Sequence, residues 1–123
     1  MKKKEVLELS TQYLDKVIKH YGESKFYSTT PYLSVENSKY SDTQDSYTKG
    51  EFCHVLNEIT IYWKNILSEE ELFRTLIHEY VHYLQSPTWM TRYYKKGYRY
   101  DTHPYEVQAY REEQNWKIIS YAT

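Results

Sequence analysis

Residues 68–86 carry the feature that most constrains this chain, an H-E-x-x-H pattern that runs from His78 through Glu79 to His82 inside a segment with helical spacing. Positions i and i+4 lie one above the other on the same face of a helix, so the two imidazoles can bind one ion. The glutamate then lies beside the ion, where a general base can act on water. The sequence therefore predicts a metal-binding helix.

The flanking residues carry their own helix signals. Ser68 followed three positions later by Glu71 is typical of a capping box, and Pro87 ends the segment. Its apolar side chains recur at helical spacing and predict one buried face: Leu72, Leu76, Ile77, Tyr80, Val81 and Leu84. The histidines fall on a neighbouring stripe. This context favours a metal-binding helix over an ordinary amphipathic helix with two surface histidines.

Composition limits the class of protein. The 123 residues are enough for one small domain, predicted as 1–123, and a formal net charge of −1 gives no bulk field to attract nucleic acid or an anionic membrane. Cys53 is the single cysteine, which favours a reducing compartment. We expect a cytoplasmic protein, because no apolar run has the length of a signal peptide core or a membrane span. We also expect a monomer or a small homo-oligomer.

The N-terminal third is predicted as a helix followed by a strand. Residues 3–21 show helical apolar spacing, and Gly22 is a typical residue to end a helix. Residues 24–35 are rich in β-forming side chains, with Pro31 among them. A proline confines such a segment to a sheet edge or divides it into two short strands.

The middle and the end of the chain complete an α+β pattern. Residues 36–50 are polar and predict a surface loop, and residues 51–63 alternate as in a hairpin, with His54 expected in a strand. A last helix is predicted from Pro104 to about residue 120. We therefore expect a small mixed sheet with the first helix and the motif helix packed on one side, closed by the C-terminal helix.

The connector 88–103 interleaves basic and aromatic residues over 92–100. Such side chains can stack on bases and pair with phosphates. They suit equally a solvated loop or a wall beside a substrate. Nucleic acid is not the expected partner, because the basic stretch is short and the whole chain is not basic.

The third metal ligand must come from outside the motif. A catalytic zinc site typically has three protein ligands and one open position, and an extended H-E-x-x-H-x-x-G-x-x-H pattern fails here, because Gln85 and Thr88 stand where glycine and histidine are needed. Glu106, in the first turn of the last helix, is the predicted third ligand, with His103 and Glu113 as alternatives.

The motif with its downstream Glu106-Val107-Gln108-Ala109 resembles the zincin metallopeptidases of the gluzincin type, and at this length the single-domain minigluzincins. The resemblance implies a zincin-like fold and a zinc-dependent peptidase with His78, His82 and Glu106 as ligands. Larger gluzincins carry an acidic residue four places after the ligand glutamate, and here that position is Tyr110. Glu113 or a backbone carbonyl would then have to support a histidine ligand.

The implied reaction is hydrolysis of a peptide bond by metal-activated water, with Glu79 as general base. The oxyanion also needs a hydrogen-bond donor, for which Tyr110, Tyr105 and His103 are the candidates. The resemblance implies an extended peptide substrate paired with an edge strand at 59–63. The alternative functions are an inactive zincin-fold binding module, and a nucleic-acid-associated protease recruited through residues 92–100.

Overall fold

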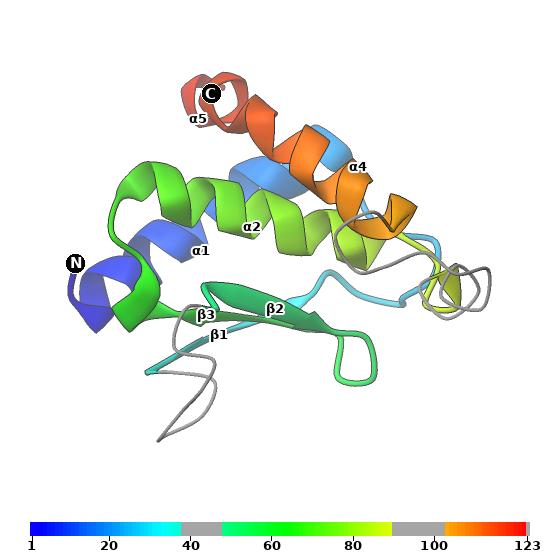
Figure 1. Ribbon diagram of the computed structural model, residues 1–123, viewed down its shortest axis with the longest axis horizontal. Helices are drawn as coiled ribbons and strands as arrows, with labels where there is room; N and C mark the ends of the chain where they lie inside the picture. The colour runs from blue at the N-terminus through cyan, green and yellow to red at the C-terminus, as the bar shows by residue number, and fades with distance from the viewer. Residues whose placement is uncertain (38–47, 90–102, 123) are drawn as a thin grey trace.

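The computed structural model describes residues 1–37, 48–89 and 103–122 (Figure 1). Most of the loop predicted at 36–50 and the whole basic and aromatic stretch at 92–100 lie outside the described residues. The predictions made for those two segments therefore stay predictions.

The first helix, α1, spans Lys3–Tyr21 as predicted. Gly22 ends it with a φ of 78°, a left-handed conformation that costs glycine little, and its N–H donates to the carbonyl of Ile18 at 2.7 Å. One side of the helix is buried, through Val6, Ser10, Tyr13, Leu14 and Val17. This side packs against the second helix and the sheet.

Three strands form one mixed sheet in the order β1-β3-β2. They are β1 (Tyr32–Glu36), β2 (Gly50–Cys53) and β3 (Glu58–Tyr62); β1 runs parallel to β3, and β2 runs antiparallel to it. The hairpin predicted over residues 51–63 is confirmed. The strand predicted at 24–35 begins only after Pro31, at the edge of the sheet.

Two expectations about this hairpin are wrong. The predicted edge strand at 59–63 is instead central, because β3 pairs with β1 on one side and β2 on the other. His54 is exposed in the turn between β2 and β3 rather than in a strand. Asn57 closes that turn at a φ of 51°, a conformation that asparagine tolerates, and its side-chain amide donates to the carbonyl of Thr29.

The motif helix, α2 (Glu69–Leu84), lies at the centre of the molecule. Its N-cap is Ser68, whose hydroxyl accepts from the N–H of Glu71 at 3.2 Å, as predicted. The Glu71 carboxylate accepts from Leu67, one residue before the position expected in a capping box. Helix α2 is buried around most of its circumference rather than along one stripe, because other elements cover it on several sides.

Figure 1 shows the sheet on one side of α2 and the C-terminal helices on the other, with α1 alongside α2. A 3-10 turn, η1 (Trp63–Asn65), leads from β3 towards α2. The predicted C-terminal helix is interrupted: α4 (Pro104–Glu112) and α5 (Trp116–Tyr121) are separated by the 3-10 turn η2 (Glu113–Asn115). The predicted α+β class is confirmed. Among the described residues, no helix has the length and apolar character that crossing a membrane requires.

Candidate metal centre

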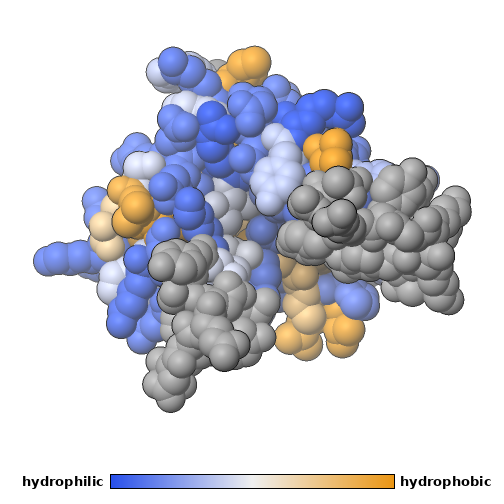
Figure 2. Space-filling model, in the orientation of Figure 1, coloured by the Kyte–Doolittle hydropathy of each residue, from blue (hydrophilic) through white to orange (hydrophobic). Residues whose placement is uncertain are grey.

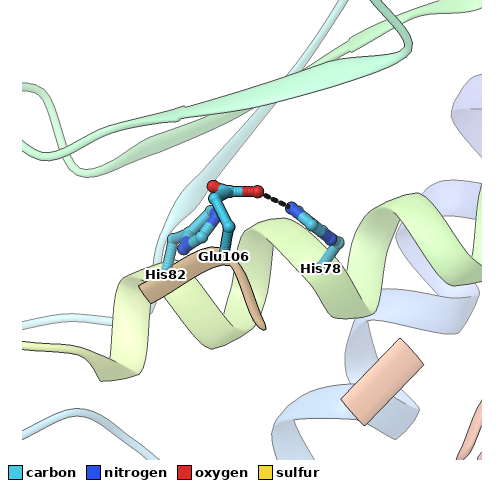
Figure 3. A group of neighbouring side chains, drawn as sticks. All are labelled: His78, His82 and Glu106. Atoms are coloured by element: carbon cyan, nitrogen blue, oxygen red, sulfur yellow. Dashed lines mark hydrogen bonds and ion pairs between the residues drawn. The ribbon is translucent and has the colours of Figure 1, made fainter. Parts of the chain in front are cut away.

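His78, His82 and Glu106 meet between α2 and α4 (Figure 3). The Glu106 carboxylate lies with Oε2 2.9 Å from His78 Nε2 and Oε1 2.7 Å from His82 Nε2. One ligand atom from each of the three residues lies within 4.8 Å of the others, and all three residues are buried. The structure thus brings together the three predicted ligands, and this group can hold a metal ion.

Two local features put these side chains in place. The histidines are one turn apart on α2, so their rings project from the same face. Glu106 lies in the first turn of α4, which starts at Pro104 and is capped by His103, whose Nδ1 accepts from the N–H of Tyr105 at 2.9 Å. Because α4 packs across α2, its first turn brings the carboxylate to the imidazoles.

Two of the three separations between ligand atoms can be compared with those around a tetrahedral ion. Zinc bonds of 2.0–2.2 Å to nitrogen and oxygen place neighbouring ligand atoms about 3.3 Å apart in a tetrahedron. The two carboxylate–imidazole contacts, at 2.7 and 2.9 Å, are shorter than this by about half an ångström, a change that a small shift of the Glu106 side chain supplies. The donor set, two imidazoles and one carboxylate, occurs in catalytic zinc sites and also in iron sites.

In the metal-free protein, each of these short contacts needs a proton between its two atoms. Burial alone would lower the pKa of His78, but its hydrogen bonds to Glu106 and Glu113 raise that pKa to about 10. Burial alone would raise the pKa of Glu106, but hydrogen bonds from His78 and His82 lower it to about 2. A metal ion takes the place of such protons, because imidazole binds metals in its neutral form.

The outer nitrogens of the two histidines have different partners. His78 Nδ1 donates to Glu113 Oε2 at 3.1 Å, and His82 Nδ1 lies 2.8 Å from Gln85 Oε1. The Gln85 amide nitrogen donates to the carbonyl of Tyr105 at 2.9 Å, so its oxygen is the atom that faces His82. His82 therefore carries a proton on Nδ1, and its Nε2 points towards Glu106 as a ligand would.

Gln85 is the residue that sequence reasoning missed. In the sequence, Gln85 stands out only as the residue that breaks the longer histidine motif. Its position three residues after His82, at the C-cap of α2, was the available signal, because such residues are neighbours on a helix surface. Glu113 was considered both as an alternative ligand and as a support for a ligand, and the structure places it in contact with the outer nitrogen of His78.

A cleft of about 410 Å³ opens beside the His78 ring, and neither His82 nor Glu106 is among the residues that line it. Its walls come from the start of β2, from α2 and from the C-terminal helices: Thr48, Lys49, Gly50, Glu71, Arg74, Thr75, His78, Glu79, Tyr110 and Glu113. Glu79 is itself buried, and this burial raises the pKa of its carboxyl. The face of the molecule shown in Figure 2 is largely hydrophilic.

Gly50 allows β2 to lie close to α2 at the cleft. A Cβ atom at this position would lie 2.7 Å from the Thr75 side-chain methyl and 3.0 Å from the carbonyl oxygen of Thr60. Only a residue without a side chain fits there without a shift of its neighbours. The sheet edge nearest to the histidines is therefore β2, and not the strand expected from the sequence.

Two of the three predicted oxyanion donors contact the metal-site histidines, and the third, His103, contacts Tyr105. The Tyr110 ring meets the His78 ring edge-on at 4.7 Å and lines the cleft. The Tyr105 ring stacks on His82 at 4.0 Å. His103 is buried and caps α4. Their catalytic roles stay predictions.

Comparisons of the chain with protein-family models, with curated proteins and with solved structures found no match. The resemblance to zincins therefore depends on the motif and on the geometry of the three ligating residues.

Proposed function

We propose that this protein is a zinc-dependent peptidase that hydrolyses peptide bonds with Glu79 as general base. The observation that supports it most is the buried convergence of His78, His82 and Glu106, with His78 and the neighbouring Glu79 lining an adjacent cleft. A group that only stabilised the fold would have no need of a carboxylate next to the ion or of a cleft beside it.

The bound metal would supply Lewis acidity, which polarises the scissile carbonyl and makes water acidic enough to react. Glu79 accepts a proton from the attacking water and later passes it to the leaving amine. The water oxygen bonds to the carbonyl carbon as the C–N bond breaks, so the products are a carboxylic acid and an amine. Glu113 and Gln85 hold the two imidazoles in their ligating orientation.

The substrate would bind in extended form along β2. Within the described part of the chain, β2 pairs only with β3, and the peptide would pair with its other edge. Gly50 brings this edge next to α2, and backbone hydrogen bonds to it would set the register of the peptide. The peptide contact expected at residues 59–63 is therefore proposed for β2 instead.

Metal analysis of purified protein, combined with peptidase assays, tests the proposal. We expect about one zinc per wild-type chain, loss of zinc in Glu106→Ala, and normal zinc in Glu8→Ala, a matched change at an exposed residue of α1. Glu79→Gln should keep zinc and lose hydrolysis of an unstructured casein-like substrate.

Three results would contradict the proposal. Zinc retained by Glu106→Ala would show that Glu106 is not the third ligand. Hydrolysis by Glu79→Gln at the wild-type rate would show that Glu79 is not the general base. Iron in place of zinc would contradict the choice of metal, since two histidines and one carboxylate also form iron sites. Zinc binding without turnover would favour the inactive binding module. Salt-dependent retention on DNA would favour the nucleic-acid-associated protease.

A further inference from the structure

Two cationic side chains line the cleft. Lys49 lies just before β2, and Arg74 lies on α2. Arg74 precedes His78 by four residues, which is about 6 Å along a helix axis. An extended peptide advances about 3.3 Å per residue, so a substrate side chain one or two residues from the reacting carbonyl would come within reach of Arg74.

The carboxylates of the cleft are largely engaged already. Both oxygens of Glu113 are used, since Oε2 accepts from His78 and Oε1 lies 3.8 Å from Arg74 Nη1. Glu71 Oε1 accepts from the N–H of Leu67 and pairs with Lys49 at 3.3 Å. The third carboxylate of the lining, Glu79, is buried and is the proposed general base.

The cations, in contrast, keep unused donors. A guanidinium has five N–H groups, and in the described part of the chain Arg74 uses them for Glu70, at 2.9 Å from Nε, and for the longer contact with Glu113. Lys49, whose side chain is 44% exposed, has Glu71 as its described partner and has three donors. The exposed pair of Lys49 with Glu71 contributes little and rearranges easily, whereas the Arg74 side chain is half-buried and also lies over the Trp116 ring.

We propose that this cleft selects peptides with a carboxylate at the substrate position beside Arg74. The inference rests on the proposed peptidase function and names its substrate class. Arg74 would bind the carboxylate through its planar N–H groups, and Lys49, which lines the same cleft, would add a second positive charge. The carboxylate comes either from an acidic side chain or from the C-terminus of a short peptide. A cleft of about 410 Å³ is of the size that admits such a group.

Cleavage of matched peptides tests the selection and separates the two sources. One pair carries Glu or Gln at each position around the cleaved bond, and a second pair ends in a free acid or an amide. Hydrogen bonds to a charged group favour the carboxylate form by about tenfold or more in kcat/KM. Preference for Glu at one position identifies a side-chain site, and preference for the free acid identifies the C-terminus.

Substitutions of the two cations connect the preference to the cleft. Arg74→Gln should reduce the preference to near unity while cleavage of the neutral peptide persists, Arg74→Lys should restore part of it, and Lys49→Gln should reduce it. Arg111→Gln, a matched loss of charge on the exposed side of α4, should leave it unchanged. Because Arg74 also contacts Glu113, zinc content is measured in each variant, and Lys49→Gln decides the question if Arg74→Gln loses zinc.

Binding to the inactive Glu79→Gln protein, followed by anisotropy of labelled Glu and Gln peptides, separates this inference from the peptidase proposal. Tighter binding of the Glu peptide that Arg74→Gln abolishes supports carboxylate recognition even if no peptide is cleaved. Equal binding of the two peptides, or no binding of either, overturns it, and cleavage of a neutral peptide by the wild type would still support the peptidase.

Discussion

Gln85 and Glu113 show how single residues set the chemistry of the two histidines. Glu113 gives His78 an anionic partner, and Gln85 gives His82 a neutral one. Gln85 is fixed in turn by Gln108, whose side-chain oxygen accepts from the Gln85 amide at 2.8 Å. A buried amide with all its partners satisfied has one orientation, so the ring of His82 has one orientation too.

We predict that Gln85→Met weakens zinc binding by about 10- to 100-fold, the range found when the outer partner of a histidine ligand is removed. The methionine fills the space but accepts no hydrogen bond from His82. Competition with a chelator of known affinity measures the change. Gln12→Met, on the exposed side of α1, is the control, and equal affinity in the two variants would show that Gln85 does not support the site.

Gly50 determines how closely β2 lies against α2. Both the strand and the helix contribute residues to the lining of the cleft. The Thr75 side chain, which would meet an added Cβ, also donates through its hydroxyl to the carbonyl of Glu71 at 2.7 Å. A substitution at this contact therefore affects both β2 and α2.

Gly50→Ala should lower the free energy of unfolding by about 1–3 kcal/mol, the usual cost of added volume at a packed contact. Urea denaturation followed by circular dichroism measures it. Thr75→Ser removes the obstructing methyl group and keeps the hydroxyl, so the double variant should recover part of the loss. If Gly50→Ala is as stable as the wild type, β2 does not approach α2 as closely as described.

The same element shows what the sequence could and could not predict. The spacing of apolar residues predicted both long helices, and alternation predicted the hairpin. Ile59 and Ile61 are fully buried on the helix side of the sheet, and their alternation indicates that face correctly. Alternation does not indicate which strands lie beside β3, because the parallel pairing with β1 joins segments far apart in the sequence.

The residues of the candidate site could also be predicted only in part from the sequence. His78 and His82 are set by local spacing, which a sequence shows directly. Glu106 was one of three possibilities, because its place depends on how α4 crosses α2. The interruption of the last helix at residues 113–115 also had no clear local signal, and it lies where Glu113 meets His78.

At the scale of the whole molecule, the C-terminal helices are attached to the rest by a few specific contacts. Tyr13 on α1 donates its hydroxyl to the carbonyl of Trp116 at 2.7 Å, and its ring stacks on Phe73 of α2 at 3.8 Å. Lys16 donates to the carbonyl of Ser120. A metal ion held by both α2 and α4 would add a further link between these layers.

We predict that excess zinc raises the melting temperature of the wild-type protein and that a chelator reverses the rise. A ligand that binds only the folded chain stabilises it by about 2.7 kcal/mol at a hundred times its dissociation constant. Differential scanning fluorimetry measures the shift. Glu106→Ala should show little shift, and an equal shift in both proteins would place the zinc elsewhere.

The buried Tyr13 predicts a loss of stability at alkaline pH. Burial, with a smaller contribution from Tyr21, raises the pKa of its hydroxyl in the folded protein, while the unfolded chain ionises near the ordinary value of 10. The stabilisation is therefore complete below about pH 10 and is lost as the pH rises above it.

Tyr13→Phe should be less stable than the wild type by about 1 kcal/mol at pH 7, because a hydrogen bond is lost, and this difference should shrink above about pH 10. Urea denaturation at pH 7 and at several alkaline values measures it. Tyr32→Phe, at a side chain that is 62% exposed, is the control. A difference that does not change with pH would contradict the assignment to Tyr13.

Anomalous diffraction at the zinc edge, from crystals of the zinc-loaded protein, tests the central claim most directly. The account predicts a single strong peak 2.0–2.2 Å from the Nε2 atoms of His78 and His82 and from a carboxylate oxygen of Glu106. A peak bound elsewhere, or no peak between these three side chains, would contradict it.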